Sequence, residues 1–165
     1  MSVVTPVIVP RHKMVAFYGI PTGQSGLDVS YFRMKKFTQF TFSKNPKEYN
    51  RQYVDEPFGE NDVMGYDPSI SYAFDKYRDL VIQEDIVGIH NREKIGDNAV
   101  RSILLVDTDT GDAYERRYAI IPNAEGDNIN VYTYSGTMKC RGELVHGEAS
   151  SNDDWSTCTF TPASA

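Results

Sequence analysis

The chain has 165 residues, the size of one domain with a single hydrophobic core. Its residues are 40% apolar and 24% charged, and no apolar run approaches the ~20 residues of a membrane span, which excludes a helical membrane protein. The net charge of −6 argues against a protein that grips nucleic acid by neutralising phosphates. The first residues lack the basic segment of a secretory signal, so we expect synthesis in the cytoplasm.

The N-terminal third of the chain predicts an extended arm followed by a hairpin. Residues 1–26 are expected to form the arm, because prolines interrupt its first part and residues 19–26 (GIPTGQSG) are typical of a flexible loop. In residues 31–43 apolar and polar residues alternate with period 2, which predicts one half-buried strand. Asn45-Pro46 marks a turn, and residues 47–54 are expected to return as the second strand of that hairpin.

Residues 54–66 predict a long loop, because prolines, glycines and acids break any periodic pattern there. Its apolar residues Phe58 and Met64 have no local core to join. An extended loop that carries exposed apolar residues is a candidate contact surface.

The rest of the chain predicts strands around one helix. Residues 69–75 alternate apolar and polar, residues 79–91 carry aliphatic residues at helical spacing, and residues 100–106 are apolar on both parities. Further strands are expected at 113–121, 129–140, 142–148 and 155–160, with a turn at 107–112 and a loop at 122–128. The predicted fold class is mainly β, an antiparallel β-sandwich or partial barrel with one short α-helix, in a single domain over residues 1–165.

Sites for catalysis, metals or cofactors are not indicated by the sequence. The run 107–112 (DTDTGD) has the residues but not the spacing of a calcium loop and is better explained as a turn. The three histidines are far apart, no GxSxG elbow or phosphate-binding loop is present, and Glu84 and Asp85 are expected on a solvated helix face. Cys140 and Cys158 are expected to be reduced and partly buried. We therefore expect no enzyme, no metal and no cofactor.

One stretch of sequence resembles a known family. Residues 44–75 (KNPKEYNRQYVDEPFGENDVMGYDPSISYAFD), then IVGIHN and ILLVDTDTGDAYERRYAII, resemble the major tail tube proteins of long-tailed, siphovirus-like bacteriophages. The resemblance implies a virion structural protein of the phage tail that self-assembles into hexameric rings, with four strands of each subunit completing a large inner β-barrel. The rings would stack into a tube through which DNA passes without specific binding. Tape-measure and tail terminator or tip proteins are the implied further partners.

The resemblance also implies roles for particular residues. The inner-barrel strands would be residues 32–42, 69–75, 100–106 and 113–121, whose candidate lumen-facing residues are Arg33, Lys35, Gln39, Thr41, Ser71 and Asp75. The loop 54–66 would stack the rings, with candidate interface residues Tyr53, Val54, Asp55, Glu56, Phe58, Glu60, Asp62, Met64 and Tyr66.

Two other functions stay open from the sequence. The inner tube of a contractile injection system would share the architecture and differ by a sheath partner. A monomeric β-barrel that binds a small ligand would suit the aromatic content but not the acidic loop or the mid-chain helix.

Overall fold

The computed structural model describes residues 4–22 and 28–163, which are mainly antiparallel strands with one α-helix, as the sequence predicts. The helix α1 spans Val81–Asn91, and short 3-10 turns η1 (Arg11–Lys13) and η2 (Gly96–Ala99) precede β1 and β7. The strands are β1 (Met14–Thr22), β2 (Asp28–Arg33), β3 (Phe37–Ser43), β4 (Pro46–Arg51), β5 (Glu60–Tyr66), β6 (Ser69–Asp75), β7 (Val100–Asp107), β8 (Asp112–Glu125), β9 (Thr133–Cys140), β10 (Val145–Ser150) and β11 (Thr157–Pro162).

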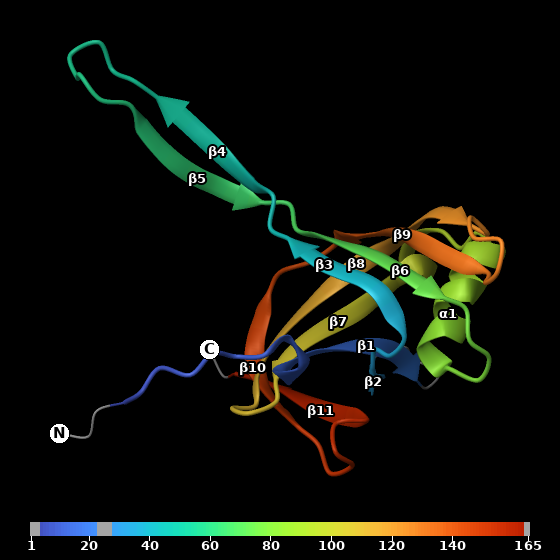
Figure 1. Cartoon of the computed structure of the whole chain (residues 1–165). Coiled ribbons are helices and arrows are strands. Elements are labelled where there is room, and N and C mark those ends of the chain that lie inside the picture. The colour runs from blue at the N-terminus through green and yellow to red at the C-terminus, as the bar shows by residue number, and fades with distance from the viewer. Residues whose placement is uncertain (1–3, 23–27, 164–165) are drawn as a thin grey trace.

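Nine strands form one curved sheet with the order β10-β11-β2-β1-β7-β8-β9-β6-β3. Because β10 also pairs with β8, the strands from β10 to β8 close into a ring (Figure 1). A small core fills this ring, and Phe17, Leu104 and Val106 in it are fully buried. Trp155 packs against this core with its ring centroid 6.2 Å from that of Phe17.

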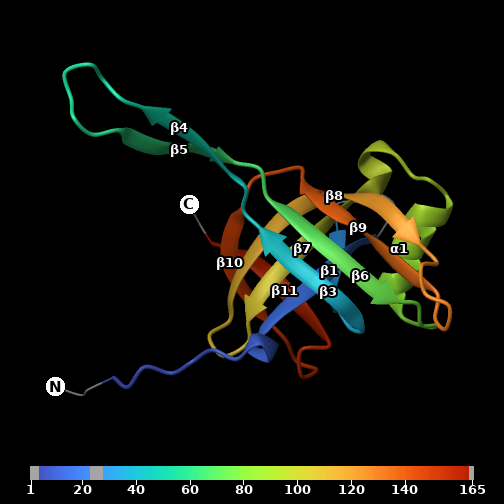
Figure 2. The ribbon, with the colours of Figure 1, turned by 45° about the horizontal axis from the view of Figure 1, so that its top comes forward.

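The long strand β8 joins the ring to the remaining strands. Its residues 112–115 pair with β10, and its residues 118–125 pair with β9. Beyond β9 lie β6 and β3, so β8, β9, β6 and β3 form a four-stranded antiparallel sheet outside the ring (Figure 2). Each of these strands runs opposite to its neighbour.

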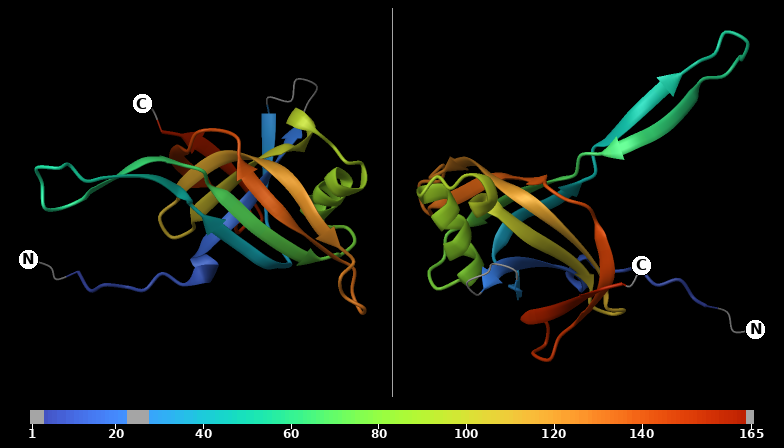
Figure 3. Two further views of the ribbon diagram at one scale, coloured as in Figure 1. Left: turned by 90° about the horizontal axis from the view of Figure 1, so that it is seen from above. Right: turned by 180° about the vertical axis from the view of Figure 1, so that it is seen from behind.

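The main core lies between this sheet, β1, β7 and the helix. Ile82, Ile86 and Ile89 of α1 are buried in one cluster with Tyr72 and Met138 of the sheet. Helical spacing of these aliphatic residues is what the sequence predicts for 79–91, and the structure confirms the helix from Val81 onward. Figure 3 shows the helix against one side of the curved sheet.

A buried polar contact fixes the helix to the strands. Asp85 accepts hydrogen bonds from the Tyr18 hydroxyl (2.5 Å) and from Arg101 Nε (2.9 Å). Tyr18 is fully buried and Arg101 is 8% exposed. The prediction of a solvated face is therefore wrong for Asp85, because its carboxylate pairs with an arginine from β7, whereas Glu84 is exposed.

Strands β4 and β5 form a separate two-stranded hairpin, which we call the arm (residues 46–66), and it projects from the body (Figures 1 and 3). In the chain the arm is inserted between β3 and β6, two strands that pair with each other. Asn45 holds the base of the arm, where its side-chain amide donates to Asp67 O (3.1 Å) and Ser69 Oγ (3.0 Å). The backbone of Asn45 has φ 46°, a left-handed conformation that asparagine tolerates.

Three predictions near the N-terminus are wrong. The N-terminal segment 1–26, predicted to be extended, is so only over the exposed residues 4–10. Residues 14–22 form β1 inside the sheet. Residues 1–3 and 23–26 lie outside the described residues. The single strand 31–43 is two strands, β2 and β3, because the strand is interrupted between Arg33 and Phe37, where Lys36 has φ 64°. Residues 46–51 pair with β5 and not with β3, because β6 occupies that position.

Two predicted loops also differ from the structure. Residues 60–66 of the expected loop form β5, whose pairing with β4 satisfies its backbone although no core supports it. Residues 122–125 continue β8, because β9 pairs beyond Pro122 after a register shift. By contrast, β6 matches the predicted residues 69–75, and its Ile70, Tyr72 and Phe74 are buried as expected.

Candidate functional site

The arm is the most exposed element of the described chain. Phe58 is 80% exposed, Met64 is 69% exposed and Val54 is fully exposed. All nine residues predicted for ring stacking lie on the arm and are exposed: Tyr53, Val54, Asp55, Glu56, Phe58, Glu60, Asp62, Met64 and Tyr66. An isolated two-stranded hairpin is marginally stable in water, and this arm has no core of its own.

The arm is acidic toward its free end. Its residues 46–66 include five acidic and two basic residues, a net charge of −3. Arg51 contacts other residues of the arm: its guanidinium lies 5.8 Å from the Tyr53 ring and donates to the Tyr49 hydroxyl. We call residues 52–60 the arm tip; they include Asp55, Glu56, Phe58 and Glu60. The ion pairs of the described residues involve other carboxylates, so the acids of the tip are available to a partner.

A second candidate surface is the outer face of β3, β6, β9 and the C-terminal part of β8. Thr41, Ser71 and Thr137 lie side by side on it, followed by Ile121 of β8. Small hydroxyl side chains prevail on this polar face: Thr41, Ser43, Ser69, Ser71, Thr133, Ser135 and Thr137. The opposite face of the same strands carries the core residues.

Four of the six lumen-facing candidates lie on the polar face, namely Gln39, Thr41, Ser71 and Asp75. Arg33 and Lys35 do not, because they belong to β2 and to the turn after it. Of the four strands predicted for the inner barrel, residues 100–106 correspond to β7, which lies in the ring, whereas the fourth strand of the polar sheet is β9. Strand β9 is outside that predicted set, and its Ser and Thr residues alternate with core residues.

The polar sheet has two edges without a strand partner in the described chain. Strand β3 is the terminal strand of the nine-stranded order. At the other edge, the pairing of β8 with β7 ends at Ala119, so residues 120–125 have β9 on one side only. Unpaired strand edges invite pairing with another chain.

A basic cleft of about 470 Å³ opens between the start of β1 and the start of β3. Three cationic residues line it, Arg11, Arg33 and Lys36, and no acidic residue does. Its apolar surface comes from methionines and phenylalanines, and the full lining of this basic cleft is Arg11, His12, Met14, Val15, Ala16, Arg33, Met34, Lys36, Phe37 and Phe40.

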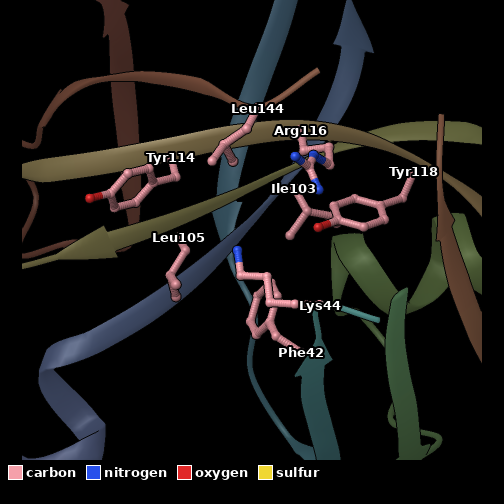
Figure 4. A pocket seen from close by; sticks show the side chains of 8 residues that line it. All are labelled: Phe42, Lys44, Ile103, Leu105, Tyr114, Arg116, Tyr118 and Leu144. Atoms are coloured by element: carbon pink, nitrogen blue, oxygen red, sulfur yellow. The ribbon is translucent and has the colours of Figure 1, made fainter. Parts of the chain in front are cut away.

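A second cleft of about 330 Å³ lies under the other end of β3 and is mainly apolar (Figure 4). Phe42, Ile103 and Leu105 contribute to it, with Lys44 and Arg116 as its charged groups. Arg116 Nε is buried and has no hydrogen-bond partner among the described residues.

A metal-binding cluster is absent from the described residues. No group of three or more His, Cys, Asp or Glu residues is placed to hold a metal ion. The run 107–112 forms a turn, in which Asp107 Oδ1 accepts from Asp109 N (3.0 Å) and Gly111 has φ 84°. Neither cysteine forms a disulfide; both are half-buried, and burial raises the pKa of Cys158 to about 12.

The histidines pack separately in the structure. His90 Nε2 lies 2.7 Å from the Tyr72 hydroxyl, and burial lowers the pKa of His90. His146 stacks on Tyr114 with ring centroids 4.7 Å apart.

Within residues 4–22 and 28–163 no helix is long and apolar enough to cross a membrane.

No protein-family model and no curated protein matches the sequence. Solved structures do match the fold. A chain from the tail of an empty gene transfer agent particle with C6 symmetry superposes with a TM-score of 0.59 at 15% identity, over 83% of this chain and 97% of that chain. A chain from the virion of the native gene transfer agent particle gives a TM-score of 0.58 at 14% identity, over 84% and 98%.

A chain of the 6-fold symmetrised anti-feeding prophage baseplate also matches, with a TM-score of 0.51 at 8% identity over 87% of this chain and 97% of that chain. These matches span almost the whole length of each compared chain, so the likeness concerns the complete fold and not one motif. The protein therefore has the fold of subunits found in phage-like tails and baseplates.

Proposed function

We propose that this protein is a structural subunit of a phage-like tail, and that it assembles into hexameric rings that stack into a tube for DNA. The observation that carries the proposal is the polar sheet β8-β9-β6-β3, which is open at both edges in a fold shared with chains of a C6-symmetric tail. In a monomer both edge strands of this sheet stay unpaired, whereas in a ring each edge would pair with the neighbouring subunit.

Strand directions support ring closure. In the polar sheet the four strands alternate in direction, so β3 and β8 run opposite to each other. Rotation about a ring axis preserves the direction of each strand relative to that axis. The β3 edge of one copy would therefore meet residues 120–125 of β8 in the next copy as an antiparallel neighbour, and the ring would have no free edge.

The polar face would then line the lumen. Its centre is formed by Thr41, Ser71 and Thr137, which carry no charge. A wall of hydroxyl groups with few cations does not neutralise phosphates, so it would let DNA move without specific binding. Lumen-facing residues are accordingly proposed from Gln39, Thr41, Ser71 and Asp75, with β9 in place of β7.

The arm would join successive rings. It is a hairpin without a core of its own, and its apolar Phe58 and Met64 are exposed in the single chain. Burial against a neighbouring ring would supply the missing support. The arm base at Asn45 is hydrogen-bonded to Asp67 and Ser69, which gives the arm a defined direction.

The proposed location is the tail of a virion, with synthesis in the host cytoplasm. Tape-measure and tail terminator or tip proteins would be the further partners. The inner tube of a contractile injection system would use the same two surfaces and would differ in binding a sheath. Co-expression with a sheath protein encoded nearby, followed by co-purification, distinguishes the two machines.

Electron microscopy of the purified, concentrated protein tests the proposal, together with its mass by light scattering. Hollow tubes or six-membered rings are the expected result. A particle that stays monomeric at every concentration, also when mixed with preformed tail tips, would contradict self-assembly.

The apolar cleft favours one other function, the binding of a small ligand by a monomer. Its volume of about 330 Å³ is within the usual range of ligand pockets, and Arg116 could face an anionic group. Mass spectrometry of the protein purified under native conditions would reveal a bound molecule. A monomer carrying a stoichiometric ligand would support this function against the tube.

A further inference from the structure

The two ends of strands β3 and β6 carry opposite charge. At one end the arm, with a net charge of −3, continues from Ser43. At the other end are the turn after β2, with Lys35 and Lys36, and the turn after β6, where Lys76 and Arg78 outnumber Asp79. These turns are in contact, because Lys36 Nζ lies 5.5 Å from the centre of the Tyr77 ring. The subunit therefore has an acidic end at the arm and a basic end at these two turns.

The basic cleft lies at this second end. Lys36 and Phe37, where β3 begins, form part of its wall, and the arm begins beyond the last residue of β3. The seven residues of β3 separate the two features by roughly 20 Å at the rise of an extended strand. The arm points away from the body (Figure 2), so its tip faces away from the basic cleft of its own chain.

We propose that the arm tip of one copy docks into the basic cleft of a second copy. This inference rests on the proposed function, because it names the receiving surface of the stacking arm. In the contact Phe58 enters the apolar part of the cleft formed by Phe37, Phe40 and the methionines, while the acids of the tip face the cationic rim. The acids are Asp55, Glu56 and Glu60, and the cations are Arg11, Arg33 and Lys36.

Size and charge both fit this occupant. The cleft volume of about 470 Å³ exceeds that of one aromatic side chain, and Phe58 is the large apolar residue most exposed at the tip after Val54. The cleft has cations and no acids, whereas the tip has acids and no cation between Gln52 and Glu60. Because the two surfaces differ, the contact is heterologous and leaves a free arm and a free cleft at the ends, which is the geometry of an open filament.

Zero-length carbodiimide cross-linking of assembled wild-type protein tests the contact directly. An equal mixture of ¹⁵N-labelled and unlabelled protein identifies links between copies by their mass. The expected product joins the Lys36 amine to Asp55, Glu56 or Glu60 of another copy. Links from these tip acids only to other lysines, such as Lys94 or Lys139, would overturn the proposal.

Charge reversal provides the second test. Arg33→Glu with Lys36→Glu is expected to shorten tubes at least about tenfold, and adding Asp55→Lys with Glu56→Lys to the same chain is expected to restore them. Arg92→Glu with Lys94→Glu is the matched control, outside the cleft, and should leave the tubes unchanged. Far-UV circular dichroism checks that each variant is folded.

The outcomes separate this inference from the proposed function. If reversal in the cleft leaves tubes intact while Asp55→Lys with Glu56→Lys abolishes them, the arm stacks rings at another surface and the docking site is wrong. If wild-type protein forms neither rings nor tubes, the proposed function itself fails.

Discussion

Replacing Asp85 by alanine is expected to destabilise the subunit strongly. The side chains of Arg101 and Asp85 are 8% and 18% exposed, and the Tyr18 hydroxyl donates to the same carboxylate. Removal of Asp85 leaves the Arg101 guanidinium buried without its counter-charge and Tyr18 without its acceptor. Breaking a mostly buried pair on one side costs about 3–5 kcal/mol. For a domain of this size that corresponds to a fall of roughly 10 °C in Tm.

The measurement is urea unfolding followed by far-UV circular dichroism, at a concentration where light scattering shows monomers, because assembly would add its own stability. Glu84→Ala is the matched control, since Glu84 is the exposed neighbour on the same helix. Its expected cost is a few tenths of a kcal/mol, the size of a helix N-terminal charge effect. If Asp85→Ala costs under about 1 kcal/mol, as the control does, the buried network does not hold α1 in place.

Three further predictions concern assembly, pH and packing. Phe58→Ala is expected to raise the critical concentration for tube growth about tenfold or more, because each subunit loses about 2 kcal/mol of apolar burial. The circular dichroism spectrum of the variant should be unchanged. Unchanged tubes in electron micrographs would contradict the role of the arm. Burial lowers the pKa of His90, so the unfolded chain binds a proton that the folded chain does not. Stability should therefore fall as pH drops below about 6.5, and His90→Gln should flatten that slope in urea unfolding between about pH 7.5 and 5; equal slopes would refute this. Gly136→Ala should cost about 1–3 kcal/mol, because the new Cβ would lie 2.6 Å from both Ile121 O and the Tyr72 hydroxyl. Gly88→Ala, in open space on the helix, should instead add up to about 1 kcal/mol, and a similar loss in both variants would rule out the steric explanation.

The elements that the sequence predicts well are strands and a helix with one face buried against a core and the other face open. In β6 the alternation of Ile70, Tyr72 and Phe74 with small polar residues is sufficient, because one face is buried and the other is open. In β7 both parities are apolar because Ile103 faces the main core and Leu104 faces the core of the ring. Two adjoining cores thus explain a pattern that the sequence could only assign to a well-covered strand.

The same two-core pattern in β1 was obscured by its glycine and proline. Phe17 and Tyr18 are adjacent and both fully buried, one in each core. Gly19 suggests a flexible loop in the sequence, but its small size is a packing requirement. A Cβ at Gly19 would lie 2.6 Å from Val29 Cγ1, a side chain of the neighbouring strand β2. Only the pairing of β1 with β2 in the fold reveals this role.

Residues 31–43 show why alternation identifies a face and not a neighbour. Phe32 in β2 and Phe40 and Phe42 in β3 all pack against the main core, so the period-2 pattern continues across the break at Lys36. Their strands nevertheless pair with β1 and β6, far apart in the sheet order. The arm is the opposite case, because its strands pair without a core and leave no burial pattern in the sequence. In the proposed assembly, the residues least constrained by the core of the monomer are those that would contact other copies, and they are identified by exposure and charge in the fold.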